Sequence, residues 1–160
     1  MKIDITLILV FSATVMTGLL AGMSLDKSIV QLPARHRMGV VAFAAFSRAN
    51  DLGNGLIAYP VLGIGSALLT IMSAIAAYWQ GVSLTNAWLL YVSVLLTLLH
   101  TISTTWAAPN MLSLRQPIND EETLTLTYSR FEKWHTVRAV LQALNFITLI
   151  WALIVYTSTL

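Results

Sequence analysis

The sequence predicts an all-α integral membrane protein, a four-helix bundle that forms one domain over residues 1–160. Three observations lead to this prediction. Hydrophobic residues make up 57% of the chain and charged residues only 10%, whereas a soluble domain has about 25% charged residues. Four apolar segments are long enough to cross a bilayer. Nearly all basic residues lie between these segments.

The four predicted spans are 5–25, 55–79, 84–106 and 139–160, and none contains Asp, Glu, Lys or Arg. About 20 helical residues cross the hydrocarbon core of a bilayer. Only the sequence QGVS separates the second span from the third, so these two form a tight antiparallel hairpin. The first span has some features of a signal peptide, but its apolar run is long and basic residues follow it, which favours a retained span.

The basic residues predict the orientation. Eight of the nine Lys and Arg residues lie beside the two long connections, and only Lys2 lies on the opposite side. Because Lys and Arg concentrate in short cytoplasmic loops, we expect both long connections in the cytoplasm and both termini outside the inner membrane. The lipid bilayer is therefore the expected partner, and the small net charge of +2 gives no indication of nucleic-acid binding.

The chain also contains a weak internal repeat. The sequences FSRAND at 46–51 and YSRFEK at 128–133 are offset by 82 residues, and nearly the same offset relates the first and third spans and the second and fourth. This spacing predicts two parallel span–loop–span repeats.

Polar side chains form stripes on two of the spans. His135, Arg138, Gln142 and Asn145 are three or four residues apart, so they share one face of a helix. His100 lies among three threonines on one face of the third span. Such groups are costly when they face lipid, so we expect them to line an internal polar pocket in the cytoplasmic half. The ordinary alternatives are headgroup contacts for Arg138 and interhelical hydrogen bonds for Gln142 and Asn145.

The long connections add candidates beside this pocket. The sequence SRANDLGNG places Arg48, Asn50, Asp51 and Asn54 before the second span, and Asn110 follows the third span. The chain has no cysteine, which excludes disulfides, thiolate metal sites and cysteine nucleophiles. It also contains no phosphate-loop, dinucleotide or zinc motif.

Two motifs carry a resemblance to a known family. The sequence TTWAAPNMLSLR follows the third span, and W-H-x-x-R (Trp134, His135, Arg138) enters the fourth. In these motifs and in its four spans the chain resembles the small membrane family that contains the anthrone oxygenases of polyketide pathways, whose members mostly have no assigned reaction. The resemblance implies oxidation of a hydrophobic aromatic substrate by O2, with Asn110, Trp134, His135 and Arg138 as the residues to carry over.

Three functions remain open from the sequence. The first is an oxygenase that acts on an anthrone- or phenol-like substrate, with His100 or His135 as the base and Arg138 as the group that stabilises the resulting anion. Arg48, Asn50, Asp51, Asn54, Asn110, Trp134, Gln142 and Asn145 would then bind the substrate. The second is a redox protein in which His100 and His135 ligate haem or copper. The third is a non-enzymatic carrier or accessory subunit for a small amphipathic molecule, which for transport would form a homo-oligomer.

Overall fold

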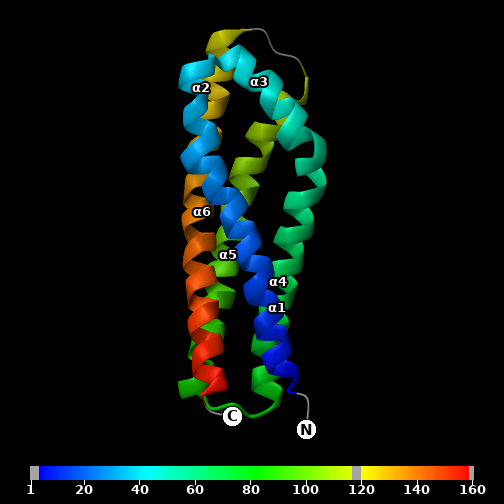
Figure 1. Cartoon of the computed structure of the whole chain (residues 1–160), viewed down its shortest axis with the longest axis vertical. Helices are drawn as coiled ribbons and strands as arrows, with labels where there is room; N and C mark the ends of the chain where they lie inside the picture. The colour runs from blue at the N-terminus through cyan, green and yellow to red at the C-terminus, as the bar shows by residue number, and fades with distance from the viewer. Residues whose placement is uncertain (1–3, 117–119, 159–160) are drawn as a thin grey trace.

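The computed structural model describes residues 4–116 and 120–158, and within these ranges the chain is helical with short turns and no strand (Figure 1). The elements are α1 Ile5–Asp26, η1 Lys27–Gln31, α2 Leu32–Met38, α3 Val40–Ala49, η2 Asn50–Asn54, α4 Gly55–Trp79, α5 Leu84–Leu112, η3 Ser113–Arg115 and α6 Glu121–Thr157. Four helical stretches are long and apolar enough to cross a membrane, namely Ile5–Met38, Val40–Trp79, Leu84–Arg115 and Glu121–Thr157. The predicted all-α four-helix bundle of a multi-pass membrane protein is confirmed.

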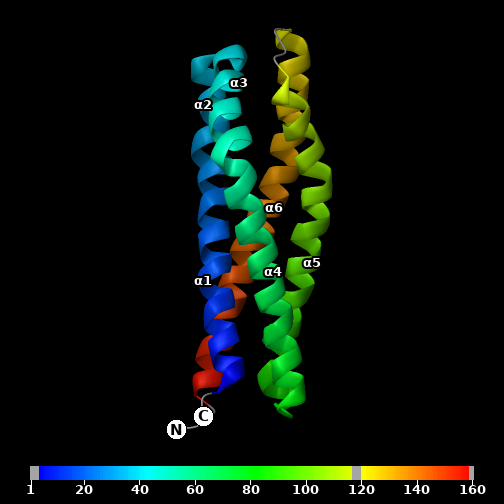
Figure 2. The same ribbon diagram turned by 90° about the vertical axis from the view of Figure 1, so that its right-hand side faces the viewer.

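The four long helices run the length of an elongated bundle (Figures 1 and 2). Helix α1 packs against α4 and α6, and α5 packs against α6. Both ends of the chain and the turn between α4 and α5 lie at one end of the bundle, called here the terminal end. The two long connections lie at the other, the connection end. Figure 2 shows that α4 and α5 diverge from their hairpin toward the connection end.

The helices match the predicted spans at some boundaries and exceed them at others. Helix α4 has the predicted bounds, whereas α5 continues to Leu112 and α6 begins at Glu121, well before the predicted span at 139. Helix α6 starts early because Asp120 caps it: the carboxylate accepts a 2.9 Å hydrogen bond from the Thr123 amide. The bonds from Thr123 lower the pKa of the Asp120 carboxyl. Lys2 and the predicted span's last two positions, 159–160, lie outside the described residues.

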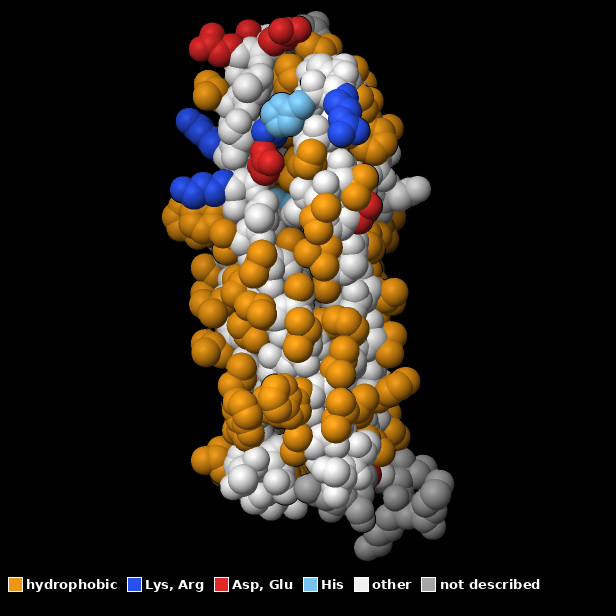
Figure 3. Space-filling model, turned by 60° about the vertical axis from the view of Figure 1, so that its left-hand side comes forward, with side chains coloured by type: hydrophobic (Ala, Val, Ile, Leu, Met, Phe, Trp, Pro, Cys, Tyr) orange, Lys and Arg blue, Asp and Glu red, His pale blue; other side chains and the backbone are white. Residues whose placement is uncertain are grey.

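The outer surface of the bundle is apolar, as a bilayer requires. Large hydrophobic side chains project outward from every long helix, with Ile57 70% exposed. Figure 3 shows a broad hydrophobic band, with charged side chains gathered above it at the connection end. This distribution fits a lipid environment around the middle of the bundle.

Two apolar clusters close the interior at its two ends. Near the terminal end, Val10, Leu90 and Leu149 form the centre of one cluster together with alanines of α1, α4, α5 and α6. Near the connection end, the second cluster joins α2, α3, α5 and α6 around Phe43 and Tyr128, whose rings pack edge-on with centroids 5.1 Å apart. The interior between these clusters is where the candidate site lies.

Close packing of α1 on α6 depends on Gly18. A Cβ at this position would approach the Phe146 ring to 2.7 Å, whereas a Cβ at Gly22 would meet nothing within 4 Å. We expect Gly18→Ala to lower the free energy of unfolding by about 1–3 kcal/mol, because the aromatic ring must move away. Gly22→Ala is the matched control and should be neutral or slightly stabilising. Reversible unfolding in mixed micelles measures both changes, and equal stability of the two variants would contradict the assigned contact.

Candidate functional site

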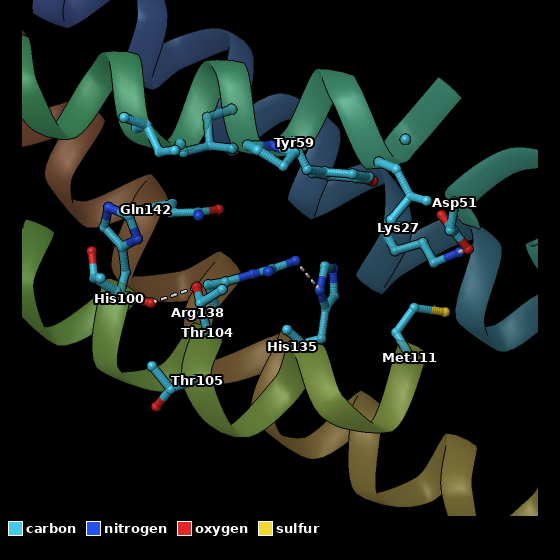
Figure 4. Close-up of a pocket in the computed structure, with 18 of the residues that line it drawn as sticks. Lys27, Asp51, Tyr59, His100, Thr104, Thr105, Met111, His135, Arg138 and Gln142 are labelled. Atoms are coloured by element: carbon cyan, nitrogen blue, oxygen red, sulfur yellow. Dashed lines mark hydrogen bonds and ion pairs between the residues drawn. The ribbon is translucent and has the colours of Figure 1, made fainter. Parts of the chain in front are cut away.

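A cavity of about 600 Å³ lies between α4 and α5 and is lined in part by Met111 and Phe131 of the apolar cluster at the connection end. Figure 4 labels most of its polar lining residues. Residues of α1 and α6 form its inner wall. Most of its lining is apolar, including Leu20, Leu56, Ile64 and Phe131. Its polar lining residues are Lys27, Asp51, Tyr59, His100, Thr101, Thr104, Thr105, His135, Arg138 and Gln142. The volume is in the range of sites for drug-sized molecules.

The cavity opens sideways, on the outer surface of the bundle. Among its lining residues, Pro60, Ile64 and Leu68 on α4 and Thr101 and Thr105 on α5 are exposed. These residues lie within the apolar stretches that form the membrane-spanning helices. The mouth of the cavity therefore lies on the outer surface of these apolar stretches.

The hydrogen bonds of His135 determine its tautomer. Arg138 Nη2 lies 2.6 Å from His135 Nδ1, and His135 Nε2 lies 3.2 Å from the carbonyl oxygen of Ser24. A guanidinium group can only donate, so Nδ1 is the acceptor and Nε2 carries the hydrogen that is donated to Ser24. Because both ring nitrogens are hydrogen-bonded, His135 holds the Arg138 guanidinium in position.

Arg138 brings an uncompensated positive charge to the cavity. Within the described residues its guanidinium has no carboxylate within 4 Å, because the two ion pairs there are Lys27–Asp51 and Arg35–Glu132. Its Nε atom is buried without a hydrogen-bond partner. The face of the Tyr59 ring lies 5.9 Å from the guanidinium carbon. An anionic group in the cavity would therefore find an available charged donor.

His100 and Gln142 extend the polar wall toward the middle of the bundle (Figure 4). His100 is 4% exposed and Gln142 is 2% exposed. His100 Nδ1 and Gln142 Oε1 are both buried and have no hydrogen-bond partner among the described residues. Buried polar atoms of this kind are usually satisfied by water or by a ligand. Nδ1 of His100 is therefore a buried ring nitrogen whose hydrogen-bonding capacity no described group uses.

Comparison with protein-family models, with curated proteins and with solved structures finds no match to this chain.

A buried ion pair between Lys27 and Asp51 completes the wall at the connection end. Lys27 is only 1% exposed, and its ammonium group also lies 5.5 Å above the Phe43 ring. The sequence predicts Asp51 as a site residue but assigns Lys27 only to the orientation signal. The missed indication was the position of Lys27, which lies two residues after the first predicted span, as Asp51 lies four residues before the second.

Of the predicted site residues, the structure brings five to the cavity: Asp51, His100, His135, Arg138 and Gln142. The others lie elsewhere. Asn145 is buried and donates a 2.9 Å hydrogen bond to Thr97 Oγ1 of α5. This is the interhelical hydrogen bond expected from the sequence as the alternative to a role in the site. Trp134 stacks on Trp106 with ring centroids 5.5 Å apart, and Asn110 donates to the Trp106 carbonyl oxygen.

The three remaining predicted residues belong to the connection end. Asn50 and Asn54 line a second, smaller cavity, and both are exposed. Arg48 is partly buried on α3, and its Nη1 atom has no hydrogen-bond partner within the described ranges. None of the three lines the large cavity.

The donor set does not favour a haem or copper ion held by His100 and His135. Such a ligand must present an unprotonated ring nitrogen with a free lone pair. Nδ1 of His135 accepts from Arg138 and Nε2 carries a hydrogen, so neither is free. Over 4–116 and 120–158, no group of three or more His, Cys, Asp or Glu side chains that could hold a metal ion is found.

Proposed function

We propose that this chain binds a hydrophobic aromatic molecule bearing an acidic hydroxyl or an enolisable carbonyl, and oxidises it with O2. The observation that carries this proposal is the uncompensated Arg138 guanidinium at the inner wall of a cavity that opens to the bilayer. The apolar lining suits the ring system, and the guanidinium suits the anion formed when the ring loses a proton. The resemblance to the anthrone oxygenase-like family points to the same class of substrate.

The length of the polar wall fits a molecule of several fused rings. His135 and Gln142 both line the cavity and are seven residues apart on α6, which corresponds to about 10 Å along a helix. The ligand enters from the lipid between α4 and α5, and its polar edge then lies along Arg138 and His100. With the long connections in the cytoplasm, as the basic residues indicate, the site lies in the cytoplasmic half of the membrane.

The chemistry requires one base and one anion-stabilising group. His100 accepts the proton from the CH2 or OH group of the substrate, because its Nδ1 atom is free whereas both ring nitrogens of His135 are engaged. Arg138 stabilises the resulting enolate or phenolate. The carbanion transfers electrons to O2 and forms a C–O bond, and the resulting peroxide anion takes back the proton from His100. The hydroperoxide then loses water, as its O–O bond and the second C–H bond break, and a new carbonyl remains. One CH2 group and one O2 thus give one C=O group and one water.

The proposal is tested by separating binding from turnover in the purified protein. We expect His100→Gln to bind an anthrone or naphthol with little change in Kd but to lower O2-dependent quinone formation by about 100-fold or more, since a general base contributes about 10²–10⁴-fold. His36→Gln is the matched control, because His36 is exposed on α2. Fluorescence titration measures binding, and quinone absorbance with O2 uptake measures turnover. Unchanged turnover in His100→Gln would remove His100 from the reaction.

A passive carrier is the second candidate, and binding without any turnover would favour it. The apolar cluster of Val10, Leu90 and Leu149 closes the interior toward the terminal end. A pathway across the whole membrane would have to open this cluster, so the geometry favours a binding or catalytic site over translocation.

A further inference from the structure

A second, smaller cavity of about 180 Å³ lies on the other side of α4, between α1 and η1 on one side and η2 on the other. Five of the described side chains that line it are polar: Asp26, Gln31, Asn50, Asn54 and Tyr59. Asp26, Asn50 and Asn54 are exposed at the connection end. A cavity with this lining and this volume has room and hydrogen-bond partners for several water molecules.

A hydrogen-bond network links the second cavity to the ion pair of the first. Gln31 Nε2 donates to Asp26 Oδ2 at 2.5 Å, and Asn50 Nδ2 donates to Gln31 Oε1 at 3.3 Å. Lys27 Nζ donates to the same Gln31 oxygen at 3.3 Å and also to Asp51. Lys27 therefore contacts a residue that lines the second cavity, Gln31, and a residue that lines the first, Asp51. The network continues from the buried ion pair to exposed groups at the connection end.

Tyr59 stands between the two cavities. Among the residues that the structure describes, only Gly55 and Tyr59 line both. A Cβ at Gly55 would lie 3.5 Å from the Tyr59 ring, so the ring packs directly over this glycine. The ring also faces the Arg138 guanidinium, whose carbon lies 5.9 Å from the ring centroid. The Tyr59 ring therefore lies between the polar second cavity and the largely apolar first cavity.

From this arrangement we infer that the small cavity is a water-filled vestibule, and that Tyr59 is the partition that keeps hydrophilic solutes out of the lipid-facing cavity. The site then has two entrances of different chemistry. Hydrophobic molecules enter between α4 and α5 from the bilayer. Water and small hydrophilic solutes enter the vestibule at the connection end and stop at Tyr59, Lys27 and Asp51. This inference does not depend on the proposed oxidation.

The absence of cysteine from the chain allows a direct test with single reporter thiols in vesicles. Ala58 lines only the vestibule and Ala67 lines only the lipid-facing cavity. With a charged, membrane-impermeant thiosulfonate on both faces of the membrane, we expect Ala58→Cys to react about tenfold or more faster than Ala67→Cys, because the reaction needs a hydrated thiolate. A lipophilic maleimide should modify Ala67→Cys, which shows that this thiol is reactive.

Removal of the partition gives the second part of the test. Tyr59→Ala should raise the rate at Ala67→Cys about tenfold, since the charged reagent and the water that ionises the thiol then reach this cavity. Tyr59→Phe keeps the ring and should leave the rate low. If Ala58→Cys, with Tyr59 unchanged, reacts as slowly as Ala67→Cys, the small cavity is not a water-filled vestibule. This result does not depend on whether Tyr59→Ala folds. A folded Tyr59→Ala variant with no increase would overturn the role of Tyr59. Both readouts are independent of turnover, so failure of the proposed oxidation would leave them unaffected.

Discussion

Arg138→Gln is expected to weaken binding of an acidic aromatic ligand by about 100-fold, the largest effect on binding that we predict for this site. Loss of one partner from a buried, hydrogen-bonded charge pair costs about 2–5 kcal/mol, and about 2.7 kcal/mol corresponds to 100-fold. The guanidinium has no carboxylate within 4 Å among the described residues, so its charge is available to the ligand. Fluorescence titration with a naphthol, above the pH at which its hydroxyl ionises, measures the change.

Two comparisons show whether charge is the cause. Arg130→Gln removes an exposed arginine from the same helix and should leave Kd unchanged. The methyl ether of the same naphthol has no ionisable hydroxyl, so its affinity should change little in Arg138→Gln. Arg138→Lys keeps the charge but not the planar fork that reaches His135, and we expect an intermediate loss. An equal loss for the naphthol and its methyl ether would indicate disturbed packing and would contradict anion recognition.

The largest effect on stability is expected from Asp51→Asn. This change leaves the Lys27 ammonium, 1% exposed, without its carboxylate. Removing one partner of a buried ion pair typically costs about 3–5 kcal/mol, because the other charge stays buried and unpaired. Reversible unfolding in mixed micelles measures the loss, and the free energy of unfolding should fall by this amount.

The paired replacement distinguishes an unpaired charge from a lost contact. Lys27→Met combined with Asp51→Leu removes both charges, and we expect it to recover most of the stability, since apolar groups of similar volume often replace a buried pair without cost. Glu132→Gln is the control in the more exposed pair with Arg35, where the Glu132 side chain is 34% exposed. Its effect should stay below about 1 kcal/mol. A double variant as unstable as Asp51→Asn would show that the pair's shape, not its charge, matters.

Much of the fold was predictable from local sequence because a bilayer imposes a simple rule. Each span needs about 20 apolar residues, and the chain satisfies this four times, so α4 matches its predicted bounds. The starts and ends that were missed belong to helical segments with polar residues, such as the early part of α6 after Asp120. Hydropathy marks only the part of a helix within the hydrocarbon and gives no indication of how far it continues into water. The internal repeat stays a prediction.

The candidate site was predictable in part. Helical spacing placed His135, Arg138 and Gln142 on one face, and that face lines the cavity because the alternative, exposure to lipid, is costly. Asn145 shares this face but pairs with Thr97, a choice that depends on a neighbouring helix. Spacing within one helix cannot show which polar group finds a partner across the bundle.

The sequence by itself determined a multi-pass α-helical membrane protein with polar groups turned inward, because hydropathy and helical periodicity are local properties of the chain. Only the tertiary structure decided what those groups do. It placed Lys27 against Asp51, which frees Arg138 from a carboxylate, and it engaged both nitrogens of His135 while leaving His100 Nδ1 free. It also opened the cavity between α4 and α5 and set Tyr59 at its border with the second cavity. These features depend on distances between residues far apart in the chain, and such distances arise only when the helices pack.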